Sequence, residues 1–212
     1  MAEDWRLPRV GTAEDPLRLA VFISGSGSGM EALLKHQQAT GCRHTTTVVI
    51  SDKPDVSGLN KAENLGVSAV VVPLPDISDK AERRLIHEQE VGEVLADYGV
   101  EVIILSGYMR LLTPSFVEQW AGRILNIHPS LLPDFPGAHA HRDVIAAGAS
   151  MSGCTVHFVD SGMDTGPIIM QKEVKVHPSD TEESLADKVK KQEHILYPIV
   201  IDMLSSGEIK SP

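Results

Sequence analysis

An asparagine and a histidine stand two positions apart in the segment Asn126-Ile127-His128-Pro129-Ser130-Leu131-Leu132-Pro133. Alternate residues of a strand point to the same face, so Asn126 and His128 would lie side by side at the end of a predicted strand. Histidine exchanges a proton near neutral pH, and an asparagine amide can donate to a developing oxyanion. The pair predicts a catalytic site. The alternative is a strand-end histidine that is satisfied by backbone groups.

Glycine and serine alternate in Ser24-Gly25-Ser26-Gly27-Ser28-Gly29, between a predicted strand and a predicted helix. Glycine lets the backbone turn sharply and approach a ligand, and the amides of a helix N-terminus attract an anion such as phosphate. Met30 stands where the dinucleotide fingerprint needs its third glycine, and no Lys-Ser/Thr follows as in a P-loop. A phosphate site of another kind and a plain flexible turn both remain open.

Asp164 lies in the turn Asp160-Ser161-Gly162-Met163-Asp164-Thr165-Gly166. A carboxylate beside a catalytic histidine would favour the protonated imidazole. Aspartate is also common in turns because of its local hydrogen bonds. Spacing alone does not bring Asp164 to His128, so the residues by themselves favour the turn interpretation.

Apolar runs that alternate with helical patterns must position these groups. Strands are predicted at 17–23, 45–50, 69–72, 102–105 and 124–127, and helices at 30–38, 59–65, 80–98 and after Pro114. This order predicts an α/β fold with a mostly parallel twisted sheet, helices on both faces and ligands at the carboxyl ends of the strands.

The last third of the chain has a different pattern. Runs at 154–159 and 168–176 predict two further strands joined by the turn, which add antiparallel pairing to the sheet. A closing helix is predicted from about Asp180, with Asp180 and Glu183 as a capping box. Its predicted buried face consists of Leu185, Val189, Ile195, Ile199 and Met203.

Length and composition limit the classes of protein. We expect residues 1–16 to form a flexible N-terminal arm and residues 17–212 a single domain. The net charge of -10 argues against nucleic acid and membrane partners. Two cysteines, Cys42 and Cys154, in no metal-binding spacing, predict a reduced, cytoplasmic protein without a metal. No signal peptide is expected, because the first residues lack a basic stretch followed by an apolar one.

Three motifs in this order resemble the folate-dependent formyltransferase family: 126–133, Phe135-Pro136-Gly137, and 153–159 followed by Asp164-Thr165-Gly166-Pro167-Ile168-Ile169. The likeness runs from Leu17 to about Gly207, almost the whole chain, with nearly matching spacing. It implies the Rossmann-like formyltransferase fold. It also implies transfer of a formyl group from 10-formyltetrahydrofolate, as co-substrate, to the amine of glycinamide ribonucleotide in de novo purine (IMP) biosynthesis.

The resemblance implies a catalytic trio of Asn126, His128 and Asp164. The amine would attack the formyl carbon, and the tetrahedral intermediate would be stabilised by Asn126 and protonated His128. Asp164 would raise the pKa of that histidine and organise a water-mediated proton transfer. None of these steps needs a metal.

Binding residues follow from the same resemblance. The phosphate and ribose of the acceptor would contact Gly27, Ser28, Gly29, Lys190 and Glu193. The folate would contact Met109, Arg110, Leu111, Leu112, Asn126 and Asp160. Two positions depart from the family: Gly29 replaces a usual asparagine, and the stretch 76–80 lacks an arginine that holds the folate in many members. Lys80 is the candidate substitute, although an ammonium does not reproduce a guanidinium fork.

Other functions remain open at this stage. A related transferase for methionyl-tRNA, a formyl-folate hydrolase and a non-enzymatic sensor of phosphorylated ligands could share this scaffold. The family includes monomers and dimers, which leaves a homodimer open. His139, His141 and His157 are interpreted as structural residues, since only their neighbourhood in the sequence suggests more.

Overall fold

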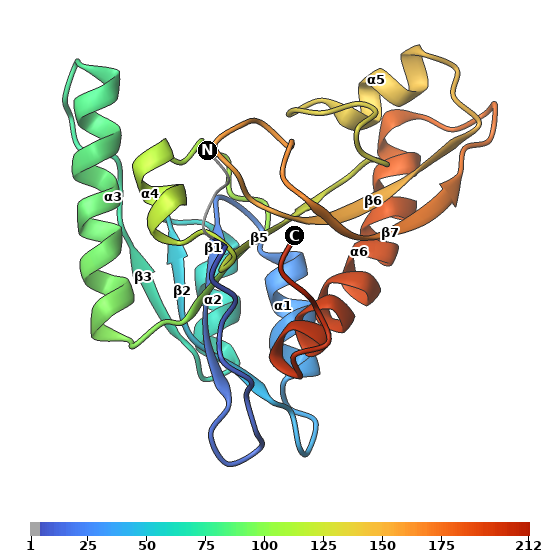
Figure 1. The fold of residues 1–212 in the computed structure, drawn as a ribbon. Helices are drawn as coiled ribbons and strands as arrows, with labels where there is room; N and C mark the ends of the chain where they lie inside the picture. Colours follow the sequence, from blue (N-terminus) through green and yellow to red (C-terminus); the bar gives the residue numbers. More distant parts are fainter. Residues whose placement is uncertain (1–4) are drawn as a thin grey trace.

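The computed structural model describes residues 5–212, which form a seven-stranded sheet in the order β3-β2-β1-β4-β5-β6-β7 (Figure 1). The strands are β1 (Leu17–Ile23), β2 (His44–Ser51), β3 (Ser68–Val71), β4 (Val102–Leu105), β5 (Ile124–His128), β6 (Met151–Phe158) and β7 (Ile168–Lys175). Neighbours among β1 to β5 are parallel, whereas β6 and β7 pair antiparallel. The predicted α/β fold with antiparallel additions is confirmed.

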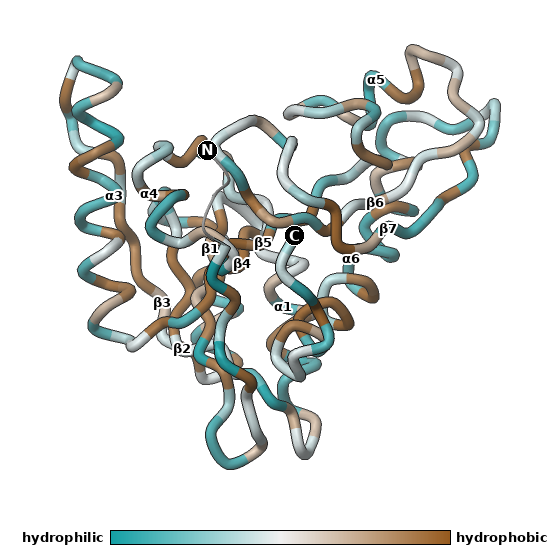
Figure 2. Tube along the Cα trace, in the orientation of Figure 1, coloured by the Kyte–Doolittle hydropathy of each residue, from teal (hydrophilic) through white to brown (hydrophobic). Residues whose placement is uncertain are grey.

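Helices cover both faces of the sheet. They are α1 (Ser28–His36), α2 (Ser57–Asn64), α3 (Lys80–Asp97), α4 (Pro114–Gln119), α5 (Ala140–Ala146) and α6 (Glu182–Ser205). Side chains of β1 alternate between two cores: Leu19 and Val21 pack in the core of α1, α2, α5 and α6, and Phe22 in the core of α3 and α4. Figure 2 shows apolar residues concentrated along the strands between these layers.

The start of α6 corrects the predicted capping box. Thr181 is the N-cap, and it exchanges hydrogen bonds with Ser184 at 3.2 and 3.0 Å. The carboxylate of Asp180 instead binds Lys188 at 2.6 Å. Ser184 prevails over Glu183 as the partner because its hydroxyl reaches the backbone amide of the cap directly.

The buried face of α6 was predicted only in part. Leu185 and Val189 are buried as expected, but Ile195 is 54% and Ile199 44% exposed. Leu196, Val200 and Leu204 are buried in their place. These residues stand one position further along the helix, a rotation of about 100°, so the apolar pattern alone did not decide which neighbouring stripe faces the core. Helix α5 was missed because its seven residues are too few to show a helical period.

Residues 5–16 lie against the domain without forming a helix or strand. The ring centroids of Trp5 and Phe158 are 5.4 Å apart, and Nε of Arg9 lies 2.7 Å from Oε1 of Glu101. The backbone N–H of Gly11 donates to the carbonyl of Ser205 at 2.8 Å. These contacts attach the described part of the arm to the domain. Its flexibility and the boundary at residue 17 stay predictions, and residues 1–4 of the arm lie outside the described residues.

Among residues 5–212, none of the helices combines the length and apolar character that a membrane span requires.

Candidate active site

A cavity of 590 Å³ opens at the carboxyl ends of β4 and β5. Its wall comes from the segment 107–112 after β4, the end of β5, the turn after β6 and Arg84 of α3. The volume is typical of a small-molecule site. The position agrees with the expectation that ligands of such sheets bind at the carboxyl ends of the strands.

Asn126, His128 and Asp164 all line this cavity. Asn126 and His128 lie on the same face of β5, as their spacing predicted. The turn after β6 brings an oxygen of Asp164 to 3.4 Å from Nδ1 of His128. The structure therefore assembles the three predicted residues, including the contact between His128 and Asp164 that spacing alone did not predict.

His157 completes the cluster and was not predicted to belong to it. Strands β5 and β6 pair Asn126 with His157, and Nδ2 of Asn126 lies 3.2 Å from Nε2 of His157. Burial lowers the pKa of His157 and favours the neutral ring. Because Nδ1 lies 2.8 Å from the carbonyl of Phe158, the proton of that ring belongs on Nδ1. Nε2 then accepts from Asn126, which fixes the amide so that its second N–H can serve a ligand.

The ring of His128 stands between two acceptors. Nε2 lies 2.9 Å from the carbonyl of Phe135, and Nδ1 faces the carboxylate of Asp164. Only a ring with a proton on both nitrogens can donate to both groups. At 3.4 Å, the Nδ1 contact is longer than an ordinary hydrogen bond, so this N–H can also turn to an oxygen in the cavity.

Two residues in unusual backbone conformations hold the loops around His128. Phe135 has φ 54° and Asp164 has φ 55°, in the left-handed region that side chains other than glycine rarely adopt. The carboxylate of Asp164 accepts the backbone N–H of Gly137 at 2.8 Å and so ties the two loops together. Such strain persists where surrounding contacts determine it, and it concentrates at functional sites.

The glycine-rich loop reaches its helix through Gly27, which has φ 62° and is the N-cap of α1. A Cβ at Gly27 would stand 3.0 Å from Cα of Gly58, and one at Gly29 would stand 2.7 Å from Oγ of Ser106. No side chain caps α1, so its first amides can meet an anion. The geometry favours the anion-binding interpretation of this loop over a plain turn.

Helix α6 brings the predicted acceptor-binding residues towards this loop. Nε2 of His194 lies 3.4 Å from Oγ of Ser28. On the same helix, burial raises the pKa of Glu193 to about 7, and the nearby charge of Lys190 opposes this shift. The predicted phosphate loop and a carboxyl group of near-neutral pKa therefore stand on facing elements.

The predicted folate segment, residues 109–112, lines the cavity together with Asp160. Asp160 is held by Thr165, whose hydroxyl donates to its carboxylate at 2.8 Å. Arg84 of α3 lines the cavity wall. Lys80, one helical turn earlier, does not line it. Arg84 is thus better placed than Lys80 to replace the arginine that is absent from 76–80.

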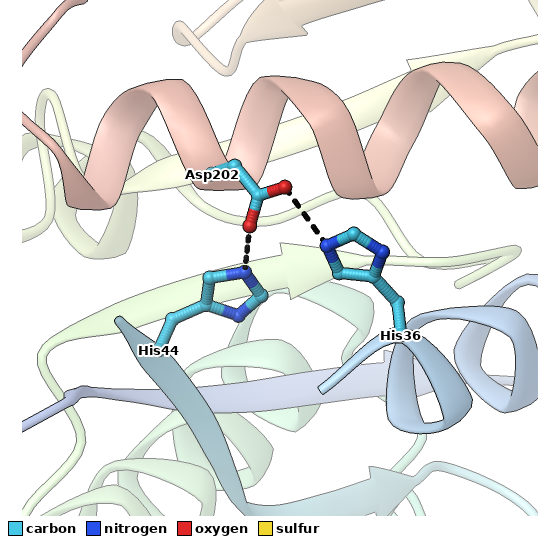
Figure 3. A group of neighbouring side chains, drawn as sticks. All are labelled: His36, His44 and Asp202. Atoms are coloured by element: carbon cyan, nitrogen blue, oxygen red, sulfur yellow. Dashed lines mark hydrogen bonds and ion pairs between the residues drawn. The ribbon is translucent and has the colours of Figure 1, made fainter. Parts of the chain in front are cut away.

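A second cluster, His36, His44 and Asp202, has donor atoms that suit a transition metal (Figure 3). Asp202 lies 2.8 Å from Nε2 of His36 and 2.9 Å from Nε2 of His44. Gln37 accepts from the backbone N–H of Thr46 at 3.1 Å, so its NH₂ end faces Nδ1 of His44 at 2.9 Å. Nδ1 of His44 must then accept this hydrogen bond. Nε2 of His44 therefore carries the ring proton and donates a hydrogen bond to Asp202. In this arrangement His44 is a hydrogen-bond donor and not a metal ligand, and the cluster joins α1, β2 and α6.

The seven-stranded sheet and the cavity lined by amide, imidazole and carboxylate groups are those of an α/β enzyme. Residues 17–201 match the family described as formyl transferase, and the chain belongs to that family.

The relatives are named either for phosphoribosylglycinamide formyl transfer or for purine biosynthesis. The chain is 38% identical over 196 residues to "Phosphoribosylglycinamide formyltransferase" of Escherichia coli, covering 92% of this chain and 90% of the relative. It is 42% identical over 192 residues to the "Trifunctional purine biosynthetic protein adenosine-3" of Drosophila melanogaster, of which it spans 14% of the length while 90% of this chain is covered. The structure of the Brucella melitensis phosphoribosylglycinamide formyltransferase superposes with a TM-score of 0.83 at 43% identity, covering 93% of this chain and all of the other.

Proposed function

We propose that this chain transfers the formyl group of 10-formyltetrahydrofolate to the amine of glycinamide ribonucleotide, as a phosphoribosylglycinamide formyltransferase of purine biosynthesis. The observation that carries the proposal is the assembly of Asn126, His128 and Asp164 on one cavity. Family membership and the names of the relatives support the two substrates.

In the proposed reaction, the amine nitrogen attacks the formyl carbon, and the carbonyl oxygen becomes an oxyanion. The second N–H of Asn126 and the Nδ1–H of His128 donate to this oxygen, and loss of one such donor typically lowers the rate about 10²–10³-fold. Asp164 faces Nδ1 of His128 at 3.4 Å and orients the imidazole in the cavity. The bond between the formyl carbon and the folate nitrogen then breaks, and a proton passes from the amine to that nitrogen. Formylated amine and tetrahydrofolate leave.

The two substrates would occupy different parts of the site. The phosphate is assigned to Gly27, Ser28 and Gly29, with Lys190 and Glu193 on the facing helix. The folate is assigned to residues 109–112 and Asp160, with Arg84 at the rim towards its anionic tail. Neither assignment involves a metal, nucleic acid or membrane. A homodimer and a cytoplasmic location remain part of the proposal.

A turnover assay tests the function. Purified protein is mixed with 10-formyltetrahydrofolate, with and without glycinamide ribonucleotide, and release of tetrahydrofolate is followed. Release that depends on the ribonucleotide supports the proposal. Release without it indicates a hydrolase, and no release in either mixture contradicts formyl transfer to this acceptor and favours a sensor or another acceptor.

A further inference from the structure

Asp52 is a fully buried carboxylate that lies one residue past the end of β2. Its Oδ2 accepts from Nε of Arg110 at 2.6 Å. Its Oδ1 is buried and has no hydrogen-bond partner within residues 5–212. A charge taken out of water in this way depends on its ion-pair partner, so the guanidinium of Arg110 is strongly held at Asp52.

Arg110 belongs to the segment 107–112, which lines the proposed folate cavity. In the sheet, β1 lies between β2 and β4. The side chain of Arg110 therefore leaves the segment after β4 and reaches across the end of β1 to the end of β2. This ion pair ties the cavity wall to the rigid part of the sheet.

Two apolar side chains also anchor this segment. Tyr108 packs edge-on against Phe22 at 5.2 Å between ring centroids, and Leu112 packs on the core of α3 and α4. Met109 and Leu111 are 64% and 56% exposed. Tyr108 and Leu112 thus pack on the protein, Met109 and Leu111 project outwards, and Arg110 reaches Asp52 with a side chain that is 39% exposed.

Hydrogen bonds fix both ends of the segment. Ser24 donates its backbone N–H to the carbonyl of Gly107 at 3.1 Å and receives the backbone N–H of Met109 on its hydroxyl at 2.8 Å. Glu88 receives the backbone N–H of Thr113 at 2.6 Å. Between these points, the side chain of Arg110 binds Asp52 and links the middle of the segment to the end of β2.

We propose that Asp52 is a positioning residue for formyl-folate: by holding Arg110, it presets the backbone of residues 107–112 in the shape that the folate ring requires. The inference rests on the proposed function. Asp52 is too buried to touch a ligand, so it acts only through Arg110. Preorganisation of this kind stabilises the bound ground state and the transition state equally, which changes KM and not kcat.

The test compares Asp52→Asn, Arg110→Gln and the double variant with the wild-type protein. Asp52→Asn is expected to raise KM for 10-formyltetrahydrofolate about tenfold or more, as for a lost hydrogen bond between charged groups. KM for the amine substrate and kcat at saturation stay near their wild-type values. The double variant is no worse than Arg110→Gln alone, because Asp52 acts only through Arg110 and has nothing left to position once that side chain is removed.

Asp180→Asn is the matched control, since Asp180 is also nearly buried and binds Lys188 at 2.6 Å, away from the segment. It should leave both KM values unchanged. A folded Asp52→Asn variant with wild-type KM for the folate overturns the inference, as does an additive effect in the double variant. Should Asp52→Asn fail to fold, a wild-type KM in Arg110→Gln overturns it equally.

Equilibrium binding of 10-formyltetrahydrofolate to wild-type and Asp52→Asn protein separates this inference from the proposed function. Wild-type binding that weakens in the variant supports the role of Asp52 even without turnover. Wild-type protein that turns over, with unchanged binding in the variant, contradicts the inference alone. Wild-type protein that neither binds the folate nor turns over contradicts both.

Discussion

Asn126 and His157 face each other across β5 and β6, with 3.2 Å between Nδ2 of the amide and Nε2 of the imidazole. The proton on Nδ1 of His157 makes Nε2 an acceptor. The histidine therefore orients the amide of Asn126 with its NH₂ group towards the imidazole. The catalytic role proposed for Asn126 therefore depends on a buried residue of the neighbouring strand.

Replacing His157 by phenylalanine should lower kcat while leaving both KM values nearly unchanged. The ring volume is kept, but the acceptor that orients Asn126 is lost. The decrease should be smaller than the roughly 10²–10³-fold loss expected for Asn126→Ala, which removes the donor itself. Steady-state kinetics check this, with His177→Gln, an exposed histidine, as control. Wild-type kcat in a folded His157→Phe variant would show that the amide is oriented by other means.

Changing Gly27 to alanine should raise KM for the amine substrate and destabilise the protein. The left-handed backbone at φ 62° disfavours a side chain by about 1–2 kcal/mol, and the new Cβ would stand 3.0 Å from Gly58. Gly92→Ala is the matched control. It lies inside α3 with nothing within 4 Å of a Cβ, so it should stabilise the helix by about 1 kcal/mol. Equal KM values in the two variants would argue against the phosphate loop.

The stability of the protein should depend on Glu193. Burial raises its pKa to about 7 from an ordinary 4.5. Between these values the folded state holds a proton that the unfolded state has lost, so this contribution to stability is complete below about pH 4.5 and disappears as the pH rises through about 7. Glu193→Gln removes the effect. The free energy of unfolding of the wild type relative to this variant should fall by no more than about 3 kcal/mol between about pH 5 and about pH 8.

Denaturant titrations at both pH values measure this difference. Glu183→Gln, at an exposed position on the same helix, serves as control and should show no such change with pH. A constant difference between wild type and Glu193→Gln would mean that Glu193 ionises in the folded protein as it does in the unfolded chain.

Asp202→Ala should destabilise the fold by about 1–3 kcal/mol without changing kcat. The side chain of His44 is fully buried and would lose the acceptor of its Nε2 proton. Asp187→Ala, an exposed change on the same helix, is the control. Thermal unfolding checks this prediction, and a chelator should leave the wild-type midpoint unchanged. A large loss of stability on chelation would indicate that the cluster binds a metal.

Much of this architecture follows from local patterns. The buried strands 17–23 and 102–105 coincide with β1 and β4, because continuous apolar runs can only be satisfied inside a covered sheet. The pairing of Asn126 with His128 follows from strand alternation. The family resemblance supplied Asp164, which spacing did not.

The remaining features depend on tertiary contacts. The role of His157 requires the register of β5 against β6, which no local pattern encodes. Likewise, the ion pair of Asp52 and Arg110 joins the segments that follow β2 and β4, two strands that are not neighbours in the sheet. The buried face of α6 was predicted only in part because two adjacent apolar stripes compete, and only packing against the sheet selects one.

The most direct measurement is the fate of a ¹³C-labelled formyl group carried by 10-formyltetrahydrofolate. NMR follows it in the presence of glycinamide ribonucleotide with wild-type protein and with His128→Ala. The account predicts that the wild type moves the label onto the amine nitrogen, and that His128→Ala loses most of this transfer while remaining folded. Label that stays on the folate or appears as formate with the wild type, or wild-type transfer by His128→Ala, would contradict it.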